Sequence, residues 1–134
     1  MRRRPRRRAP PDAALVRLAF EATLERVEAA KASLVAAVPT ARVEGRPLAD
    51  AVLGFEGELR AALSGMDAWR RNEHERLWRN CRDGIGDALR RAERARLGAP
   101  ALDFEALVDL IGEMMAPLDP FAEAERTLGR STRR

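Results

Sequence analysis

The stretch that decides the fold class is residues 12–39, DAALVRLAFEATLERVEAAKASLVAAVP. Apolar or small residues recur in it at alternating steps of four and three, which is the spacing of one face of an α-helix. Asp12 is suited to cap this helix, and Pro39 is expected to end it. The face is formed by Val16, Phe20, Thr23, Val27, Ala30, Leu34 and Ala37. The stretch therefore predicts a long amphipathic helix.

Two further helices follow with the same spacing of apolar residues. Pro47 suits the first position of a second helix, which Ser64 and Gly65 are expected to close. Asp67 is expected to cap a long third helix that ends at Gly98. Because the connection between them is short, these two helices should form an antiparallel hairpin. Their apolar faces are Leu48, Val52, Phe55, Leu59, Leu63 and Met66, and then Trp78, Cys81, Ile85, Ala88 or Leu89, and Ala92.

A fourth helix is interrupted by two prolines. Asp103 is its expected cap, and its apolar face is Phe104, Leu107, Ile111 and Met114. Pro117 lacks a backbone donor and Pro120 restricts the backbone of Asp119, so the helix should break there. Leu118, Phe121, Glu125 and Leu128 keep the helical spacing beyond the break. We therefore expect a short fifth helix with Asp119 as its cap and Pro120 at its first position.

These patterns together predict an all-α fold, an antiparallel up-down four-helix bundle whose fourth helix is broken at Pro117 to Pro120 into a short fifth helix. A length of 134 residues fits a single domain, which we place at residues 12–129. Residues 1–11 are rich in arginine and proline and are expected to form a disordered arm. Residues 130–134 are expected to be a disordered basic tail. The sequence shows no alternating pattern that would predict a strand, and no internal repeat.

Four glycines lie inside the predicted second and third helices, namely Gly54, Gly57, Gly84 and Gly86. Each costs up to about 1 kcal/mol relative to alanine in a helix. Close approach of a neighbouring helix, or a bend, is the expected reason for them. The alternative is a kink that opens a groove.

The charge of the chain is segregated between its ends and its body. The formal net charge is +4, yet residues 9–129 hold 16 Lys and Arg against 21 Asp and Glu, a net charge of −5. Within the body, residues 67–97 carry +3 and residues 101–129 carry −6, so the third and fourth helices should favour each other as neighbours. Exposed pairs of this kind are each worth under about 1 kcal/mol. The sequence therefore predicts a basic arm on an acidic bundle.

No residue pattern points to catalysis, a cofactor or a metal. His74 lies between Glu73 and Glu75, which a helix directs to either side of it, so we expect a structural histidine at the edge of the core. Cys81 lies on the apolar face of the third helix and should be buried and inert. It is two helical turns from His74, which is too far for joint metal coordination. We expect a protein that is not an enzyme, with no metal and no cofactor; a weaker alternative is an enzyme or ligand carrier that uses His74.

Trp69 is the residue that the helical pattern leaves over. It lies nine residues before Trp78, so an ideal helix puts the two on opposite sides and only Trp78 can face the core. Trp69 either covers the hairpin turn by packing on Met66 or is exposed as an aromatic anchor for a partner. The second alternative predicts a protein-binding site made of Trp69, Arg70, Arg71 and Arg76.

The first eight residues hold six arginines: Arg2, Arg3, Arg4, Arg6, Arg7 and Arg8. Guanidinium groups on a flexible arm can contact phosphates without reading a base sequence. A solubilising tail, or an upstream-start artefact of the coding sequence, explains the same arginines.

The remaining features indicate in which cellular compartment the protein acts and which class of function it has. The longest apolar run, residues 32–39, is too short to span a bilayer, and a single cysteine fits a reducing cytoplasm. We therefore expect a cytoplasmic, non-enzymatic helical bundle with an interaction or structural role, which binds a protein partner or itself and not a membrane. The alternative is an accessory nucleic-acid-associated protein whose arginine arm contacts phosphates.

Overall fold

The structure, a computed structural model, describes residues 11–41, 45–98 and 104–129. These residues form five α-helices and no strand: α1 (Pro11–Ala41), α2 (Gly45–Ser64), α3 (Glu75–Gly98), α4 (Phe104–Met115) and α5 (Pro120–Leu128). Three short 3-10 helices join them: η1 (Met66–Trp69) and η2 (Asn72–His74) between α2 and α3, and η3 (Ala116–Leu118) between α4 and α5. The arginine arm and the basic tail lie outside the described residues.

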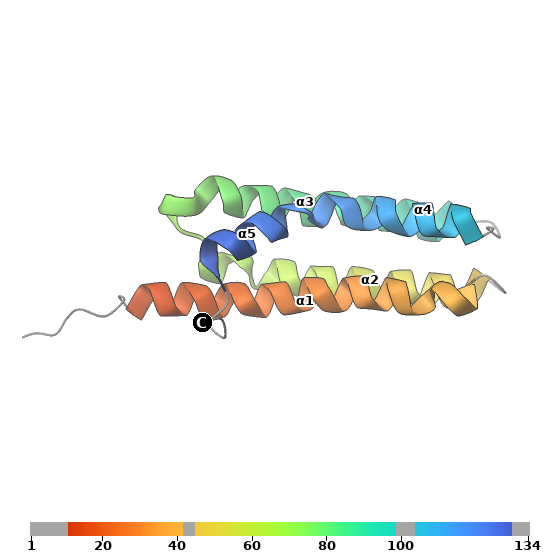
Figure 1. The fold of residues 1–134 in the computed structure, drawn as a ribbon, viewed down its shortest axis with the longest axis horizontal. Coiled ribbons are helices and arrows are strands. Elements are labelled where there is room, and N and C mark those ends of the chain that lie inside the picture. The colour runs from red at the N-terminus through yellow and green to blue at the C-terminus, as the bar shows by residue number, and fades with distance from the viewer. Residues whose placement is uncertain (1–10, 42–44, 99–103, 130–134) are drawn as a thin grey trace, which may run out of the picture.

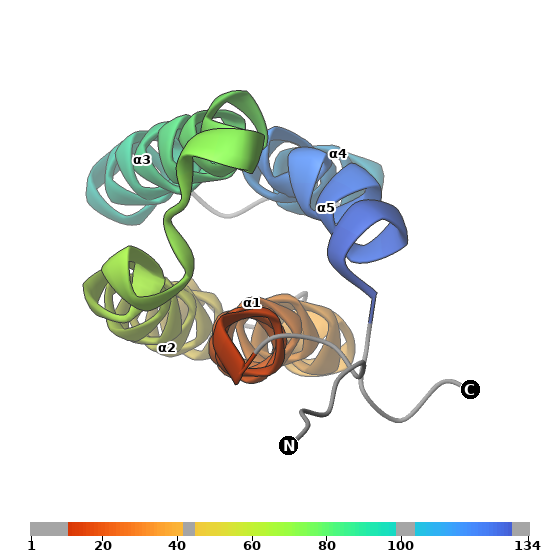
Figure 2. The same cartoon turned by 90° about the vertical axis from the view of Figure 1, so that its left-hand side faces the viewer.

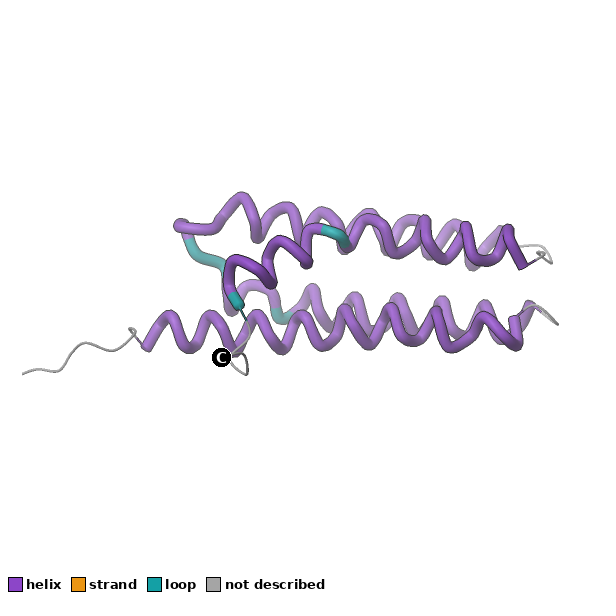
Figure 3. Tube along the Cα trace, viewed as in Figure 1, coloured by secondary structure: helices purple, strands orange, loops and turns teal. Residues whose placement is uncertain are grey.

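The helices run alternately up and down (Figure 1). Seen end on, α1, α2, α3 and α4 occupy the four corners of a bundle, and α5 continues from α4 toward α1 (Figure 2). The breaks in the helical path lie between α2 and α3 and between α4 and α5 (Figure 3). The predicted antiparallel up-down four-helix bundle with a broken fourth helix is therefore confirmed.

The core is formed by the faces that the helical spacing selects. All seven positions of the predicted face of α1 are buried, and so are the central positions of the other helices, such as Phe55, Ile85 and Met114. Alanines fill much of the space between the helices, because only a few aromatic residues are available. Phe121 brings α5 onto α1, where its ring stacks on Phe20 with 6.5 Å between ring centroids. The bundle thus has a single continuous core.

The break in the fourth helix coincides with a glycine in α3. α4 ends at Met115, and Pro120 is the first residue of α5, as predicted. A Cβ atom placed on Gly84 would overlap the carbonyl oxygen of Pro117 and lie 3.3 Å from its carbonyl carbon. Gly84 therefore lets α3 approach the backbone of η3 closely, which is the expected reason for an interior glycine. Asp119 occupies the position before α5 but makes no side-chain capping bond.

Several predicted helix ends are wrong. α1 begins at Pro11, which the sequence places in the arm, so Asp12 lies in its first turn and is not its cap. The helix also continues past Pro39 to Ala41, because a proline in the last turn removes one hydrogen bond from a segment that is close to its end.

The largest error concerns the start of the third helix. α3 begins at Glu75 and not at Asp67, which lies in η1 and caps nothing through its side chain. The backbone of Arg70 and Arg71 is extended, with ψ of 124° and 152°. This extension turns Trp69 into the bundle, and the resulting contacts with α1 outweigh the helical propensity of the segment.

Candidate functional site

Trp69 is part of the core and not an exposed anchor. Its side chain is fully buried, and its Nε1–H donates to Thr23 Oγ1 at 3.0 Å. Its ring meets Phe20 edge to face, with 5.0 Å between centroids. The alternative of an exposed anchor is therefore wrong for Trp69, because α1 supplies both an apolar partner and an acceptor for the indole. Of the two alternatives, packing within the hairpin turn is the nearer, since Trp69 and Met66 are both buried in η1, and the contacts that fix the indole come from α1.

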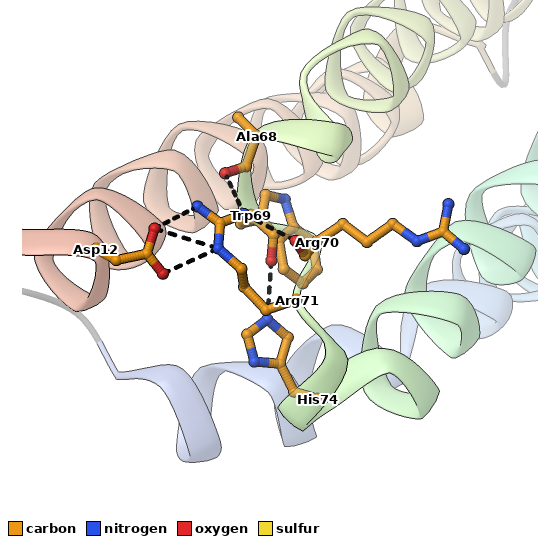
Figure 4. A network of polar contacts seen from close by, with 6 residues as sticks. All are labelled: Asp12, Ala68, Trp69, Arg70, Arg71 and His74. Atoms are coloured by element: carbon orange, nitrogen blue, oxygen red, sulfur yellow. Dashed lines mark hydrogen bonds and ion pairs between the residues drawn. The ribbon is translucent and has the colours of Figure 1, made fainter.

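Arg71 connects the α2–α3 connection to the first turn of α1 (Figure 4). Its Nη2 donates to Asp12 Oδ1 at 2.7 Å and its Nε to Asp12 Oδ2 at 3.0 Å. Its Nη1 donates to the carbonyl oxygens of Ala68 and Arg70. The hydrogen bond from Arg71 holds the pKa of Asp12 below its usual value. Arg71 is thus engaged within the protein, as a clamp between two segments distant in sequence.

Arg70 is also partly engaged. Its guanidinium lies 4.2 Å from the ring centroid of Trp78 and donates to both carboxylate oxygens of Glu75, at 3.0 and 2.7 Å. Arg79 donates to the same carboxylate at 2.7 Å. The hydrogen bonds from Arg70 and then Arg79 lower the pKa of Glu75 to about 2. Of the four residues predicted to bind a partner, only Arg70 and Arg76 are exposed, so the proposed site loses its aromatic centre.

His74 lies at the edge of the core, as expected, but in η2 and not on the face of the third helix. Its Nε2 is 2.8 Å from the carbonyl oxygen of Trp69, and its ring stacks on the indole with 6.3 Å between centroids. The imidazole therefore supports the backbone of the turn that buries Trp69. No group of three or more His, Cys, Asp or Glu side chains suited to a metal ion occurs in the described part of the chain.

A cleft of about 280 Å³ opens beside His74, between the start of α1 and the end of α5. Both signs of charge line it, the carboxylates of Asp12 and Glu73 and the guanidinium groups of Arg17 and Arg71. This volume is at the lower limit of ordinary ligand sites, and the charges largely compensate one another. The cleft therefore favours no particular class of ligand.

Cys81 has the environment of an inert thiol. The side chain is free and buried, and burial, followed by the charge of Glu123, raises its pKa to about 12. A thiol with this pKa is almost fully protonated near neutral pH, and the thiolate is the reactive form. The expectation that Cys81 is buried is confirmed.

A buried ion pair between α2 and α3 was not predicted. Glu56 is 1% exposed in its side chain, and Arg96 Nε donates to its Oε1 at 2.9 Å. The spacing of Glu56 from Val52 and Leu59 places it on the buried side of α2, which is the signal that could have revealed it. Its partner, 40 residues away, could not be identified without the fold. Because Arg96 satisfies this carboxylate, the pair has a structural role.

The outer side of α1 exposes an apolar surface. Leu15 is 60% exposed and Leu18 is 55% exposed, and their spacing of three makes them neighbours on the helix. Ala22, also exposed, extends them along the same face. We call these three residues the leucine patch. It lies in the first turns of α1, the helix whose beginning extends beyond the other helices (Figure 1). Val35, also exposed, lies near the other end of α1, and the exposed Leu53 and Val108 belong to α2 and α4.

The chain matches no known protein-family description, no curated protein sequence and no solved structure. Among the described residues, none of the helices combines the length and the apolar character needed to cross a membrane. The candidate sites therefore depend on the geometry of this chain alone. Among the described residues, the leucine patch brings together two of the large apolar side chains that remain exposed.

Proposed function

We propose that the protein is a cytoplasmic, non-enzymatic helical bundle that binds another protein chain through the leucine patch. The observation that carries this proposal is that Leu15 is 60% exposed and Leu18 is 55% exposed, and that the two are neighbours on the surface of one helix. Leucines of the bundle interior, such as Leu34 and Leu59, are fully buried in the same structure. Covering the patch would stabilise a complex by about 25 cal/mol for each Å² of apolar surface removed from water.

The spacing of the patch suits a helical partner. Leu15, Leu18 and Ala22 follow steps of three and four, which is the pattern by which one helix face packs into the groove of another. The helix that carries them is held in place by its buried side, where Phe20 and Thr23 contact Trp69. The patch is therefore presented on a rigid element, which lowers the entropy lost on binding.

Site-specific photocrosslinking tests this function. A photoreactive amino acid replaces Leu18 in the full-length protein, produced in the organism that carries the gene, and a matched protein carries it at Leu53, which is 51% exposed on α2. We expect light-dependent adducts with a protein chain, whether a second copy or another protein, from position 18 and not from position 53. Equal adduct formation at both positions, or none at position 18, would contradict the proposal.

The second candidate function is nucleic-acid association through Arg2 to Arg8, which the charge segregation of the sequence favours. Phosphate contacts predict binding that falls steeply with salt and depends on the arm. Retention of the full chain and of a chain lacking residues 2–8 on immobilised nucleic acid, across a salt series, tests this. Equal retention of the two proteins would contradict it.

A further inference from the structure

We infer that the chain that binds the leucine patch is a basic amphipathic helix of a different protein, which lies along the outer side of α1 with a lysine or arginine opposite Glu25. This inference rests on the proposed function of the patch, for which it names the chemistry of the partner. It extends the contact from the leucine patch into the second half of α1.

The outer side of α1 carries a second helical stripe, roughly opposite the buried one. Its members follow alternating steps of three and four residues, and all of them are exposed. We call them the outer seam: Leu15, Leu18, Ala22, Glu25, Ala29, Ala32 and Ala36. This strict spacing, kept over about 32 Å of helix, is the repeat by which helices pair side by side in coiled coils.

The exposed side of α3 differs sharply from the outer seam in composition. Each exposed side chain that the structure describes in α3 is polar or charged, for example Arg79, Asp83 and Arg90. The outer seam contains one charged residue, Glu25, and two leucines that are more than half exposed. A helix that is apolar on both sides is typical of a helix that is covered on both sides.

The sizes of the seam residues determine which side chains suit the partner. Ala29, Ala32 and Ala36 let a second helix approach closely, so the large apolar side chains of that half of the contact must come from the partner. In the other half, Leu15 and Leu18 supply large side chains themselves. The seam therefore fits a helix with large aliphatic residues at the same spacing.

Glu25 determines the charge of the partner. It is the central residue of the outer seam, and none of the ion pairs among the described residues includes it. A helix lying on the seam removes this carboxylate from water, which costs free energy unless a cation of the partner pairs with it. Residues 9–129 hold 16 Lys and Arg against 21 Asp and Glu, so the protein body as a whole also attracts a basic helix.

A second copy of this chain does not supply that cation. In a parallel pair in register, the two Glu25 side chains face each other. In the antiparallel register that pairs Leu15 with Ala32 and Leu18 with Ala29, Glu25 faces Ala22, and the two carboxylates are offset by only about 4.5 Å along the axis. Both arrangements bring like charges together without a cation in the seam.

The arginine-rich segment of this chain lacks the other half of the required chemistry. Residues 2–8 consist of arginines around Pro5. They have the positive charge but no leucine-sized side chain to cover the alanines of the seam. A partner with both features is therefore a separate amphipathic helix.

Binding of two synthetic helical peptides to the full chain, followed by fluorescence anisotropy, tests this chemistry. The arginine peptide has seven seam positions at steps of three and four, with arginine at the central one and leucine at the others. Because Glu25 is central in the outer seam, this arginine faces it whichever way the peptide runs. The glutamate peptide differs only in a central glutamate, and both carry balanced lysine and glutamate on the outside. The labelled peptides are kept dilute so that they do not pair with themselves.

We expect the arginine peptide to bind the wild type at least about tenfold more tightly than the glutamate peptide. Glu25→Arg should reverse this preference, and the milder Glu25→Gln should reduce it. Ala29→Glu, in the half of the seam without leucines, should weaken the arginine peptide. Ala122→Glu and Leu53→Glu place the same charge at exposed positions of α5 and α2 and should leave binding unchanged. Circular dichroism checks that each variant folds.

Photocrosslinking in the organism that carries the gene connects the peptide to the natural partner. A photoreactive amino acid at Ala29 should give adducts with the same protein as one at Leu18. Digestion of these adducts should place the attached residues in a basic amphipathic segment. Addition of the arginine peptide to a cell extract should reduce the adducts at both positions, whereas the glutamate peptide should not.

The outcomes separate this inference from the proposed function. Equal binding of the two peptides, or adducts at position 18 without any at position 29, would overturn the basic helix along the seam and leave the proposed function standing. Adducts with a second copy of the chain would do the same. Peptide binding that occurs only after deletion of residues 2–8 would assign the seam to the chain's own arginines and overturn the inference. Absence of any adduct at position 18 would contradict the proposed function itself.

Discussion

Replacing Gly84 by alanine tests whether the close approach of α3 to η3 determines how the broken fourth helix packs. Gly84 is buried in α3, and a Cβ atom there would overlap the carbonyl oxygen of Pro117. The obstacle is backbone, whereas Cδ of Pro120, 3.9 Å from the same Cβ position, is at ordinary van der Waals distance. Backbone cannot move aside as the end of a flexible side chain can. Gly84→Ala must therefore push α3 and η3 apart.

Two opposing effects determine how much Gly84→Ala changes the free energy of unfolding. Alanine is better than glycine in a helix by about 1 kcal/mol. Forcing an extra carbon into a packed interior costs about 1–3 kcal/mol, and a backbone obstacle places this site toward the upper end. We expect a net loss of about 1–2 kcal/mol in the free energy of unfolding. For a domain of this size the loss corresponds to a decrease of about 4–10 °C in Tm.

Gly57→Ala is the matched control, because a Cβ at this exposed position of α2 meets nothing within 4 Å. It should gain about 0.5–1 kcal/mol from helix propensity alone. Urea unfolding followed by circular dichroism at dilute protein concentration measures both variants. If Gly84→Ala were as stable as the wild type or more so, the close approach to Pro117 would not constrain the fold, and the structural explanation of this glycine would be refuted.

Three further predictions concern buried polar groups. Arg96→Met should cost about 3 kcal/mol because it leaves the carboxylate of Glu56 buried and unpaired, and the double variant with Glu56→Leu should recover most of that loss in a double-mutant cycle. Trp69→Phe should lower the free energy of unfolding, measured in urea, by about 1–2 kcal/mol, since Thr23 loses its indole donor. An unchanged free energy would show that this hydrogen bond does not stabilise the fold. Folding raises the pKa of Cys81 from 9.0 to about 12, so unfolded chains ionise first and stability should fall as pH rises through that window. Cys81→Ala should lack this component, and the native thiol should react slowly with a disulfide reagent near neutral pH but rapidly in urea.

Much of the fold could be predicted because the helical pattern and its proline and glycine boundaries act locally. The face of α1, the end of α2 at Ser64, the end of α3 at Gly98 and the start of α5 at Pro120 follow from spacing and backbone chemistry. The start of α3 could not be predicted in this way. Residues 67–74 have no strong helix breaker, and they leave the helical path because of contacts that Trp69 makes with residues 46 and 49 positions away.

The same distinction explains which site residues were predicted. Charge and exposure on a single helix can be read from the sequence, so Arg76 and the acidic character of α4 could be anticipated. The roles of Trp69 and Arg71 depend on α1, to which each is bonded across more than 40 residues. Tryptophan and arginine are common in binding sites, but here both side chains make contacts within the protein. The residue type alone does not show which of the two uses applies. The leucine patch was overlooked although a signal for it was present, because Leu15 and Leu18 lie outside the face of α1 that the spacing correctly predicts to be buried.

Specificity in this bundle comes from a few contacts that an alanine-rich core cannot supply. Alanines at positions such as Ala30, Ala88 and Ala92 let helices approach but fit many registers almost equally well. Glu56 with Arg96 fixes α2 against α3, while Gly84 at Pro117 fixes α3 against η3. Trp69 and Arg71 fix the α2–α3 connection against α1. None of these contacts involves Leu15 or Leu18, which remain exposed on α1. Our proposal assigns these two leucines to a contact with another chain.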